Sequence, residues 1–207
     1  MLQGLIKDYG LKWSDNNSAA LMIARLTKVT DCDDIFNWVK QVKARKPKLS
    51  DFMDFMVISG LRFSEAVESY NLIIKLASEG KLHAYYNAES EILEHYRFKE
   101  LFIRATKKAF ITFMPQPLIL KISENAHLTE CGIINPVRRA GLRLRFGDIR
   151  EAHATFLTNY LRQPEIDFLH GRVGMSIFMT NYFNPALIKD LKERAFKAIA
   201  ELKASVT

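Results

Sequence analysis

The chain has 207 residues, and 48% of them are hydrophobic, which is enough for a full apolar core and excludes a wholly disordered chain. Its formal charge of +7 at pH 7 favours a polyanionic partner, either nucleic acid or an anionic membrane surface. The sequence has no apolar run of about eighteen residues, the length that a membrane span requires. The first residues also lack the apolar core and cleavage site of a signal peptide.

The chain contains two cysteines, Cys32 and Cys131, and neither belongs to a CxxC pair or a His–Cys pattern. A structural zinc site is therefore not expected, and the composition suits a reducing compartment. We predict a cytoplasmic protein without a bound metal or organic cofactor.

Residues 1–44 are predicted to form an amphipathic N-terminal helical segment or remnant, with Asp15 or Asn16 as the first helix cap. Acidic residues begin the segment 32–42 and basic residues end it, as the helix dipole prefers. The basic stretch 43–48 contains a proline and is interpreted as a linker or elbow. A larger domain is then expected over 45–207.

Apolar residues recur at helical spacing from Leu49 to Val57, which predicts a helix that ends at Gly60. Ser64 is the expected N-cap of the next helix, which would run to Gly80. Arg62 lies between the two helices, on an elbow with nearby backbone N–H groups, a setting that suits an anion. The alternative is an ordinary arginine on a surface turn.

Residues 82–114 are rich in aromatic and β-branched side chains, and partial alternation predicts a small antiparallel sheet. The charged segment 104–108 would lie near its turn. Residues 118–146 are expected to form short helices broken at Gly132, Pro136 and Gly141. The predicted fold is mainly α with a small antiparallel β-sheet or hairpin, of the α+β class.

An apolar stripe from Ile149 to Tyr160 predicts a helix that begins near Arg150, and Gln163 and Pro164 close it. A second stripe predicts a C-terminal helix over 186–204, which could pack on its own domain or on a neighbouring copy.

The segment 137–150 is rich in arginine, whose planar fork can hold a phosphate with two hydrogen bonds. For Arg138 and Arg139 we favour a solvated face or a nonspecific contact with a DNA backbone. Arg150 differs because it opens an apolar helix and is expected to point into the fold. Tyr182 follows an apolar run and is a candidate nucleophile, which would need nearby cations or a base because a phenol has a pKa near 10.

Three motifs in order carry a resemblance to a known family. SGLRFSE (59–65) resembles the first arginine box of the tyrosine recombinase and phage integrase family, and GDIREAHATFL (147–157) resembles the second. FLHGRVGMS (168–176) is similar to the Leu-Gly-His segment, and Tyr182 falls where the family has its nucleophile. The resemblance is greatest to the integrases of archaeal viruses and plasmids, and it implies a tyrosine-recombinase catalytic-domain-like fold.

The resemblance implies a site-specific DNA recombinase that integrates a viral genome by cutting and rejoining DNA through a 3′-phosphotyrosyl intermediate. Tyr182 would be the nucleophile, and Arg62, Arg150 and Arg172 would bind the phosphate. Lys107 would be the general acid, with Lys108 as the alternative. The resemblance also implies double-stranded DNA as the partner, a tetramer on that DNA, no membrane, and no cofactor.

Two positions depart from the family pattern. Gly147 stands where the family commonly has a histidine, and Arg172 stands where it has a histidine or tryptophan. His153 or His170 could take over the role of the general base. The place of His153 on the apolar stripe instead favours a packed core histidine.

Other interpretations stay open. One is a catalytically impaired or non-enzymatic DNA-binding fragment of an integrase, which the glycine at position 147 favours. Another is a helical scaffold that matches the motifs by chance, in which Arg62, Arg150 and Tyr182 would lie far apart. The chain is also short for a complete integrase, so it could be a full protein or a C-terminal fragment.

Overall fold

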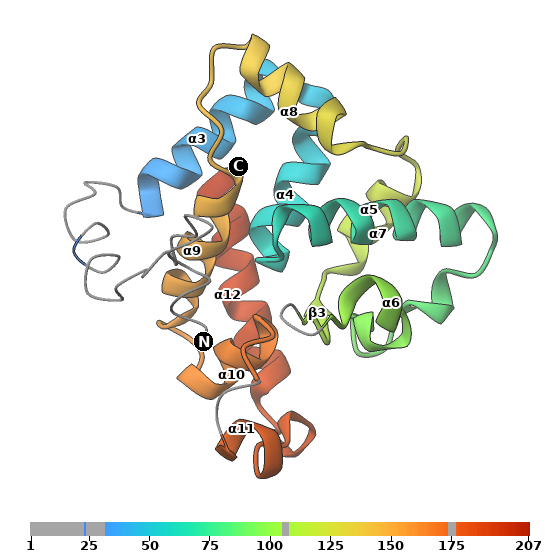
Figure 1. Cartoon of the computed structure of the whole chain (residues 1–207), viewed down its shortest axis with the longest axis vertical. Coiled ribbons are helices and arrows are strands. Elements are labelled where there is room, and N and C mark those ends of the chain that lie inside the picture. Colours follow the sequence, from blue (N-terminus) through green and yellow to red (C-terminus); the bar gives the residue numbers. More distant parts are fainter. Residues whose placement is uncertain (1–22, 24–31, 105–107, 174–176) are drawn as a thin grey trace, which may run out of the picture. The chain divides into compact units, whose positions relative to one another are not determined.

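The computed structural model describes residue 23 and residues 32–104, 108–173 and 177–207 (Figure 1). The predicted caps Asp15 and Asn16 lie outside this part of the chain. Most described residues belong to the compact unit Cys32–Thr207, which begins earlier than the boundary predicted after residue 44. This unit is mainly helical with one small antiparallel sheet, so the predicted α+β class is confirmed.

The core of the unit forms around helix α4 (Ser50–Ser59), which packs against α3 (Cys32–Arg45), α9 (Phe146–Leu157) and α12 (Leu191–Val206). Phe52, Met53, Phe55 and Met56 are all fully buried. A helix that is apolar on all but one narrow side, here that of Asp51 and Asp54, belongs in the centre of a core. Full burial of one such side chain stabilises the fold by about 1.5–3 kcal/mol.

The stretch predicted as an elbow connects α3 to α4 through a short 3₁₀ helix, η1 (Pro47–Leu49). Trp38 on α3 packs edge-on against Phe146, the first residue of α9, with ring centroids 5.4 Å apart. Its indole N–H donates to the carbonyl of Arg143 at 2.8 Å. These contacts attach the start of α9 to α3.

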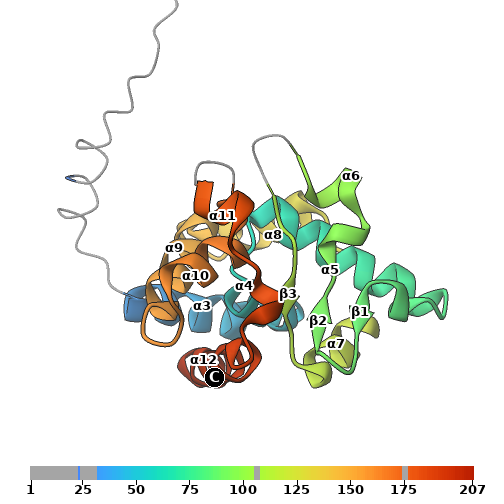
Figure 2. The same cartoon turned by 90° about the horizontal axis from the view of Figure 1, so that it is seen from below.

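Helix α5 (Phe63–Ser78) leaves the core and packs along α7 (Gln116–Ser123), as Figure 1 shows. The sheet has the order β1 (Tyr86–Asn87), β2 (Ile92–Leu93), β3 (Thr112–Phe113), and both pairings are antiparallel. Short helical segments adjoin the sheet, and Figure 2 shows its three strands side by side near α5. These segments are η2 (Leu82–Ala84), η3 (His95–Arg97) and α6 (Lys99–Phe102).

A chain of buried polar groups supports the sheet. The Tyr85 hydroxyl lies 2.8 Å from the Ser69 hydroxyl and 2.6 Å from Nδ1 of His95. Nε2 of His95 lies 2.8 Å from the Thr112 hydroxyl on β3. Each buried polar group has a partner, and so burial of these groups does not leave an unpaired donor or acceptor.

Several predicted boundaries were wrong, including the end of α9, which lies at Leu157 and not at Gln163 and Pro164. Helix α8 (Glu130–Arg139) runs through Gly132 and Pro136 and ends just before Gly141, which has a φ of +71°. A proline inside a helix costs about 3 kcal/mol, and complete burial of Ile133 and Val137 offsets this cost. Local propensity was overridden by packing.

Another wrong boundary concerns the start of α5. The helix begins at Phe63, so Arg62 occupies the N-cap position that was predicted for Ser64. The C-terminal helix, predicted for 186–204, instead begins at Leu191 after the 3₁₀ turn η4 (Pro185–Leu187) and ends at Val206.

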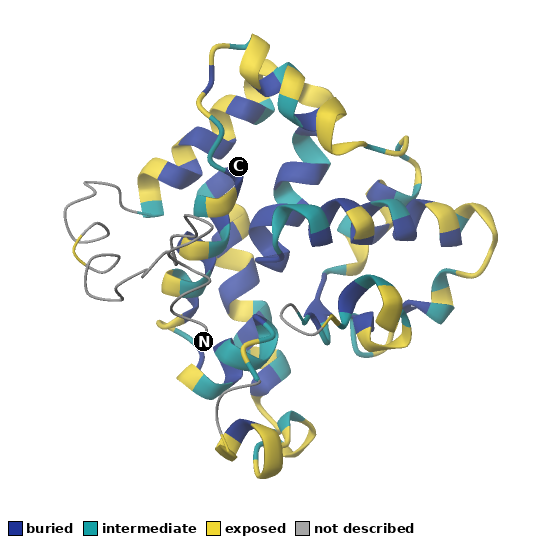
Figure 3. Cartoon of the chain, viewed as in Figure 1, coloured by how far each residue is buried: buried dark blue, intermediate teal, exposed yellow. Residues whose placement is uncertain are grey.

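Between α9 and α12 lie α10 (Gln163–Leu169) and α11 (Ile177–Asn181). In this single chain, helix α12 packs on α3, α4 and β3. In Figure 3 the buried side of α12 faces these neighbours. None of the described helices is both long enough and apolar enough to cross a bilayer.

A buried ion pair links α12 to α10. Nη1 and Nη2 of Arg194 donate to the two oxygens of Glu165 at 2.7 and 2.6 Å. The Glu165 side chain is 1% exposed, and it also accepts the backbone N–H of Arg162 at 2.7 Å. One carboxylate therefore caps α10 and binds α12.

Replacement of Arg194 by methionine should leave Glu165 buried without its partner. We expect a loss of about 2–3 kcal/mol in the free energy of unfolding, below the usual cost for a fully buried pair because Arg194 is partly exposed. Urea denaturation followed by circular dichroism measures this change in the free energy of unfolding. The control is Lys192→Met on the same helix. It removes a more exposed ion pair, in which Nζ of Lys192 lies 4.0 Å from the Glu91 carboxylate, and should change the free energy of unfolding by less than about 0.5 kcal/mol. Equal losses in the two variants would contradict the account.

Candidate functional site

Arg62 is held at the junction of α4 and α5. Gly60 ends α4 in the left-handed conformation, with a φ of +57°, which a glycine adopts without strain. Glu65 accepts the backbone N–H of Arg62 at 3.2 Å and its Nη1–H at 2.8 Å. Because the Glu65 side chain is only 3% exposed, its carboxylate fixes the direction of the arginine.

Arg150 reaches from α9 toward two other segments. Its Nη1 donates to the carbonyl of Gly60 at 2.6 Å, and its Nη2 donates to the carbonyl of His170 at 2.5 Å. The pKa of Arg150 is lowered to about 10, first by burial and then by the positive charges of Arg62 and Arg172, against the opposing effect of Glu65. Arg150 stays charged at neutral pH, and three arginines from separate segments share one electrostatic environment.

Arg172 follows a turn that only glycine allows. Gly171 has a φ of +64°, and a Cβ at this position would lie 1.7 Å from the carbonyl oxygen of Lys108. The Arg172 backbone N–H donates to the carbonyl of Asp167 at 2.7 Å. Its side chain is 52% exposed, and Nη1 lies 3.8 Å from the Asp167 carboxylate. Arg172 is thus the most accessible member of the cluster.

The predicted hairpin reaches this turn. Ile103 and Lys108 form an antiparallel bridge on either side of residues 104–107, and Phe110 stacks on Phe168 of α10 with ring centroids 5.7 Å apart. Lys107, the predicted general acid, lies outside the described residues. Its neighbour Lys108 is described, and its backbone contacts Gly171. The segment before and after the hairpin turn is therefore next to the arginine-bearing loop.

Tyr182 directly follows α11. The Thr180 hydroxyl donates to the carbonyl of Val173 at 3.3 Å, and Phe183 packs against Phe168 with centroids 6.0 Å apart. The tyrosine is 75% exposed. Among the hydrogen bonds and ion pairs of the described residues, none joins its phenol to an arginine. The structure brings Arg62, Arg150 and Arg172 together, and it places Tyr182 on a helix tethered to the segment after Arg172.

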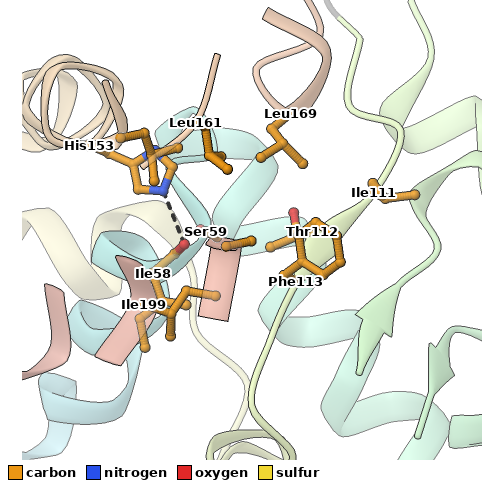
Figure 4. A pocket seen from close by; sticks show the side chains of 11 residues that line it. Ile58, Ser59, Ile111, Thr112, Phe113, His153, Leu161, Leu169 and Ile199 are labelled. Carbon is orange, nitrogen blue, oxygen red and sulfur yellow. Dashed lines mark hydrogen bonds between the residues drawn. The ribbon is translucent and has the colours of Figure 1, made fainter. Parts of the chain in front are cut away.

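Two buried histidines lie behind the arginines. Nδ1 of His153 is 2.9 Å from Nε2 of His170, and Nε2 of His153 is 3.2 Å from the carbonyl oxygen of Ile58 (Figure 4). Burial, followed by the charges of neighbouring groups, lowers the pKa of His153 to about 4 and that of His170 to about 2. His153 is 5% exposed, as predicted for a core histidine, and both rings are neutral at pH 7.

Gly147 is exposed, and a Cβ built on it meets nothing within 4 Å. The position where the family commonly has a histidine therefore faces open space. The sequence alone did not indicate the carbonyls of Gly60 and His170 as ligands of Arg150. The acid three residues after Arg62, at the start of a helix, is a capping pattern that could have indicated the role of Glu65.

Two hollows among the described residues lack the character of a phosphate site. The cavity in Figure 4 has a volume of about 20 Å³ and is lined by Ser59, Thr112, His153 and apolar neighbours, so it has room for about one water molecule. A larger groove of about 520 Å³ is mostly apolar. Within the described ranges, no cluster of three or more histidine, cysteine, aspartate or glutamate side chains could hold a metal ion.

The described chain is thus a helical α+β domain on which three arginines of separate segments share one electrostatic environment. The sequence model of the archaeal phage integrase family matches residues 27–201 of the chain, and the chain belongs to this family. No curated protein and no solved structure gives a significant match. Family membership places the chain among the recombinase-type enzymes of DNA recombination.

The buried histidines predict how stability depends on pH. His95, His153 and His170 have folded-state pKa values lowered to about 3, 4 and 2, whereas an unfolded histidine has a pKa near 6.5. As pH falls below about 6.5, the unfolded chain binds protons that the folded chain does not, so stability falls. Each histidine contributes up to about 1.4 kcal/mol per pH unit.

Urea denaturation between pH 7.5 and pH 5 should therefore show a decreasing free energy of unfolding. His95→Gln should lower the slope of the free energy of unfolding against pH by the equivalent of about one bound proton. A free energy of unfolding that is constant over this pH range would contradict the assignment of neutral, buried rings.

Proposed function

We propose that the chain is a site-specific tyrosine recombinase that cuts and rejoins double-stranded DNA through a 3′-phosphotyrosyl intermediate. The observation that supports this most directly is the convergence of Arg62, Arg150 and Arg172. They come from the end of α4, from α9 and from the loop after α10, so no local sequence pattern explains their proximity. Three arginines outnumber the two acids next to them, Glu65 and Asp167, and such an excess of positive charge is suited to a phosphate.

The three arginines bind the nonbridging oxygens of the scissile phosphate. A guanidinium has five N–H donors, and Arg150 gives two of them to carbonyl oxygens, so three remain for the phosphate. Charge builds on these oxygens as phosphorus becomes pentavalent. Donors held in place before the reaction stabilise this charge without reorganising.

Tyr182 is the nucleophile in this proposal. Its phenol oxygen attacks phosphorus as the phenol proton passes to a solvent water molecule, and the bond from phosphorus to the 5′ oxygen breaks. Lys107 gives a proton to the departing 5′ oxygen, with Lys108 as the alternative donor. In the second step a 5′ hydroxyl attacks phosphorus and releases the tyrosine. The phosphotyrosyl bond conserves the energy of the original diester.

The exposed position of Tyr182 implies a movement on DNA. No hydrogen bond among the described residues joins its phenol to Arg62, Arg150 or Arg172, so in this proposal the segment after α11 carries it to the bound phosphate. The partners in this proposal are double-stranded DNA and further copies of the chain, which assemble into a tetramer on two duplexes.

A different function is favoured by one observation. Position 147 faces open space, and the phenol of Tyr182 has no hydrogen-bond partner among the described residues. Such a site would hold DNA without cutting it. This non-enzymatic DNA-binding integrase fragment is the second candidate.

A trapping assay separates the two candidates. The substrate is a pool of duplexes of random sequence, labelled at a 5′ end and nicked so that a short 5′-hydroxyl strand diffuses away after cleavage. We expect a covalent protein–DNA adduct with the wild-type chain and none with Tyr182→Phe. Tyr96→Phe, at another exposed tyrosine, should form the adduct normally. DNA binding without any adduct would contradict the enzymatic proposal and support the second candidate.

Truncation of an arginine in the cluster should slow cleavage strongly. Loss of one preorganised donor costs about 10²–10³ in rate, so Arg150→Ala should reduce the single-turnover rate on a trapped sequence by about this factor at saturating protein. Arg139→Ala on the exposed end of α8 should weaken binding in a salt-dependent way and leave the saturated rate unchanged. Equal cleavage rates for wild type and Arg150→Ala would contradict the assigned role.

A further inference from the structure

The donor and the acceptor in each hydrogen bond of His153 and His170 can be assigned. The Ile58 carbonyl can only accept, so Nε2 of His153 carries the proton in that bond. A neutral ring then has a bare Nδ1, which must accept from the Nε2–H of His170. This leaves Nδ1 of His170 unprotonated, and that atom is buried with no partner among the described residues. The bond to His153 is thus the one polar anchor of the His170 ring in the described structure.

The same pair touches both residues that hold Arg150. One acceptor of the Arg150 guanidinium is the carbonyl of Gly60, and the other is the carbonyl of His170. The His153 ring lies against Gly60 so closely that a Cβ there would be 2.2 Å from its Nδ1. The other ring of the pair belongs to His170 itself. Movement of either ring would shift a carbonyl to which Arg150 is bonded.

Helix α9, the α4–α5 junction and the end of α10 are connected to one another by two separate sets of contacts. Helix α9 supplies both Arg150 and His153, three residues apart on one face. Arg150 joins the α4–α5 junction to the end of α10 on the side of the arginine cluster. The histidine pair joins the same two segments deeper in the core, through Ile58 and His170. The hydrogen bonds of the histidine pair therefore set the distance between the Gly60 and His170 carbonyls, to which the Arg150 guanidinium is bonded.

From this geometry we infer that His153 and His170 are positioning residues, whose hydrogen bond holds the Gly60 and His170 carbonyls where they fix the Arg150 guanidinium. The inference deepens the proposed function, because it assigns an orienting role within the same phosphate site. Neither ring touches the reacting atoms, so neither is a catalytic residue. The role needs a donor at the Nε2 position of residue 170, aimed at His153.

Two substitutions of His170 provide a matched pair. Glutamine places its amide N–H₂ near the Nε2 position and can donate to Nδ1 of His153. Asparagine is also a neutral amide, but it places its nitrogen near the Nδ1 position and cannot reach His153. His95→Gln is the control for a buried histidine in general, because His95 hydrogen-bonds to Tyr85 and Thr112 in the sheet region and contacts no arginine of the cluster.

The first readout is independent of cleavage. In protein labelled with ¹³C and ¹⁵N arginine, a guanidinium held by two carbonyls gives resolved Nη–H signals in NMR spectra, and Arg150→Lys identifies those of Arg150. We expect these signals in the wild type, in His170→Gln and in His95→Gln. We expect them to be lost in His170→Asn while its remaining spectrum stays that of a folded protein. If His170→Asn does not fold, His170→Gln becomes the test. Loss of the Arg150 signals in His170→Gln would by itself overturn the inference.

The second readout is the single-turnover cleavage rate at saturating protein on a trapped DNA sequence. A misplacement of about 1 Å costs on the order of 100-fold in rate, so His170→Asn should fall by about 30-fold to 100-fold and His170→Gln should stay within about 3-fold of wild type. Similar rates or similar Arg150 signals in the asparagine and glutamine variants would overturn the inference. If the wild type forms no adduct, the proposed function fails while the NMR comparison still decides the positioning role.

Discussion

The arrangement of the site depends on the Arg150 guanidinium and the two carbonyl groups that hold it. Its bonds to Gly60 and His170 join the α4–α5 junction to the end of α10, and both segments carry another arginine nearby. The central helix α4 is buried on nearly every side, so the junction after it has little freedom to move. A buried cation bonded to backbone oxygens thus gathers the cluster in the absence of DNA.

The positive charges of this cluster repel one another. In our proposal this repulsion favours the binding of a phosphate. Glu65 is the acid that acts on Arg150, whereas both Arg62 and Arg172 disfavour its charge. Two like charges about 7 Å apart repel by about 2 kcal/mol at an effective dielectric of about 20. A phosphate between them replaces repulsion with attraction. The neutral histidines behind the cluster add no further positive charge, so they do not increase the repulsion within the cluster in the absence of an anion.

The sequence predicted the elements of this site better than the contacts between them. Helical periodicity indicated α4 and the presence of α9, a glycine cap indicated the end of α4, and the alternation of residues 82–114 indicated the small sheet, because these signals are local. Packing overrode local rules at Pro136 in α8, and an ion pair with Glu65 moved the start of α5 to Phe63. The Gly60 and His170 carbonyls could not be predicted, since a backbone oxygen carries no residue-specific signal. The absence of a Cβ at Gly171 likewise acquires meaning only beside Lys108.

The most direct test of the account is a crystal structure of the chain bound to a DNA duplex that it has cut, or that it holds uncut as Tyr182→Phe. The account predicts one phosphate whose nonbridging oxygens accept hydrogen bonds from Arg62, Arg150 and Arg172 at about 3 Å. It also predicts that Arg150 keeps its bonds to Gly60 and His170, and that residue 182 lies in line with the 5′ oxygen. Arginines that contact separate phosphates, or a scissile phosphate that lies away from the cluster, would contradict it.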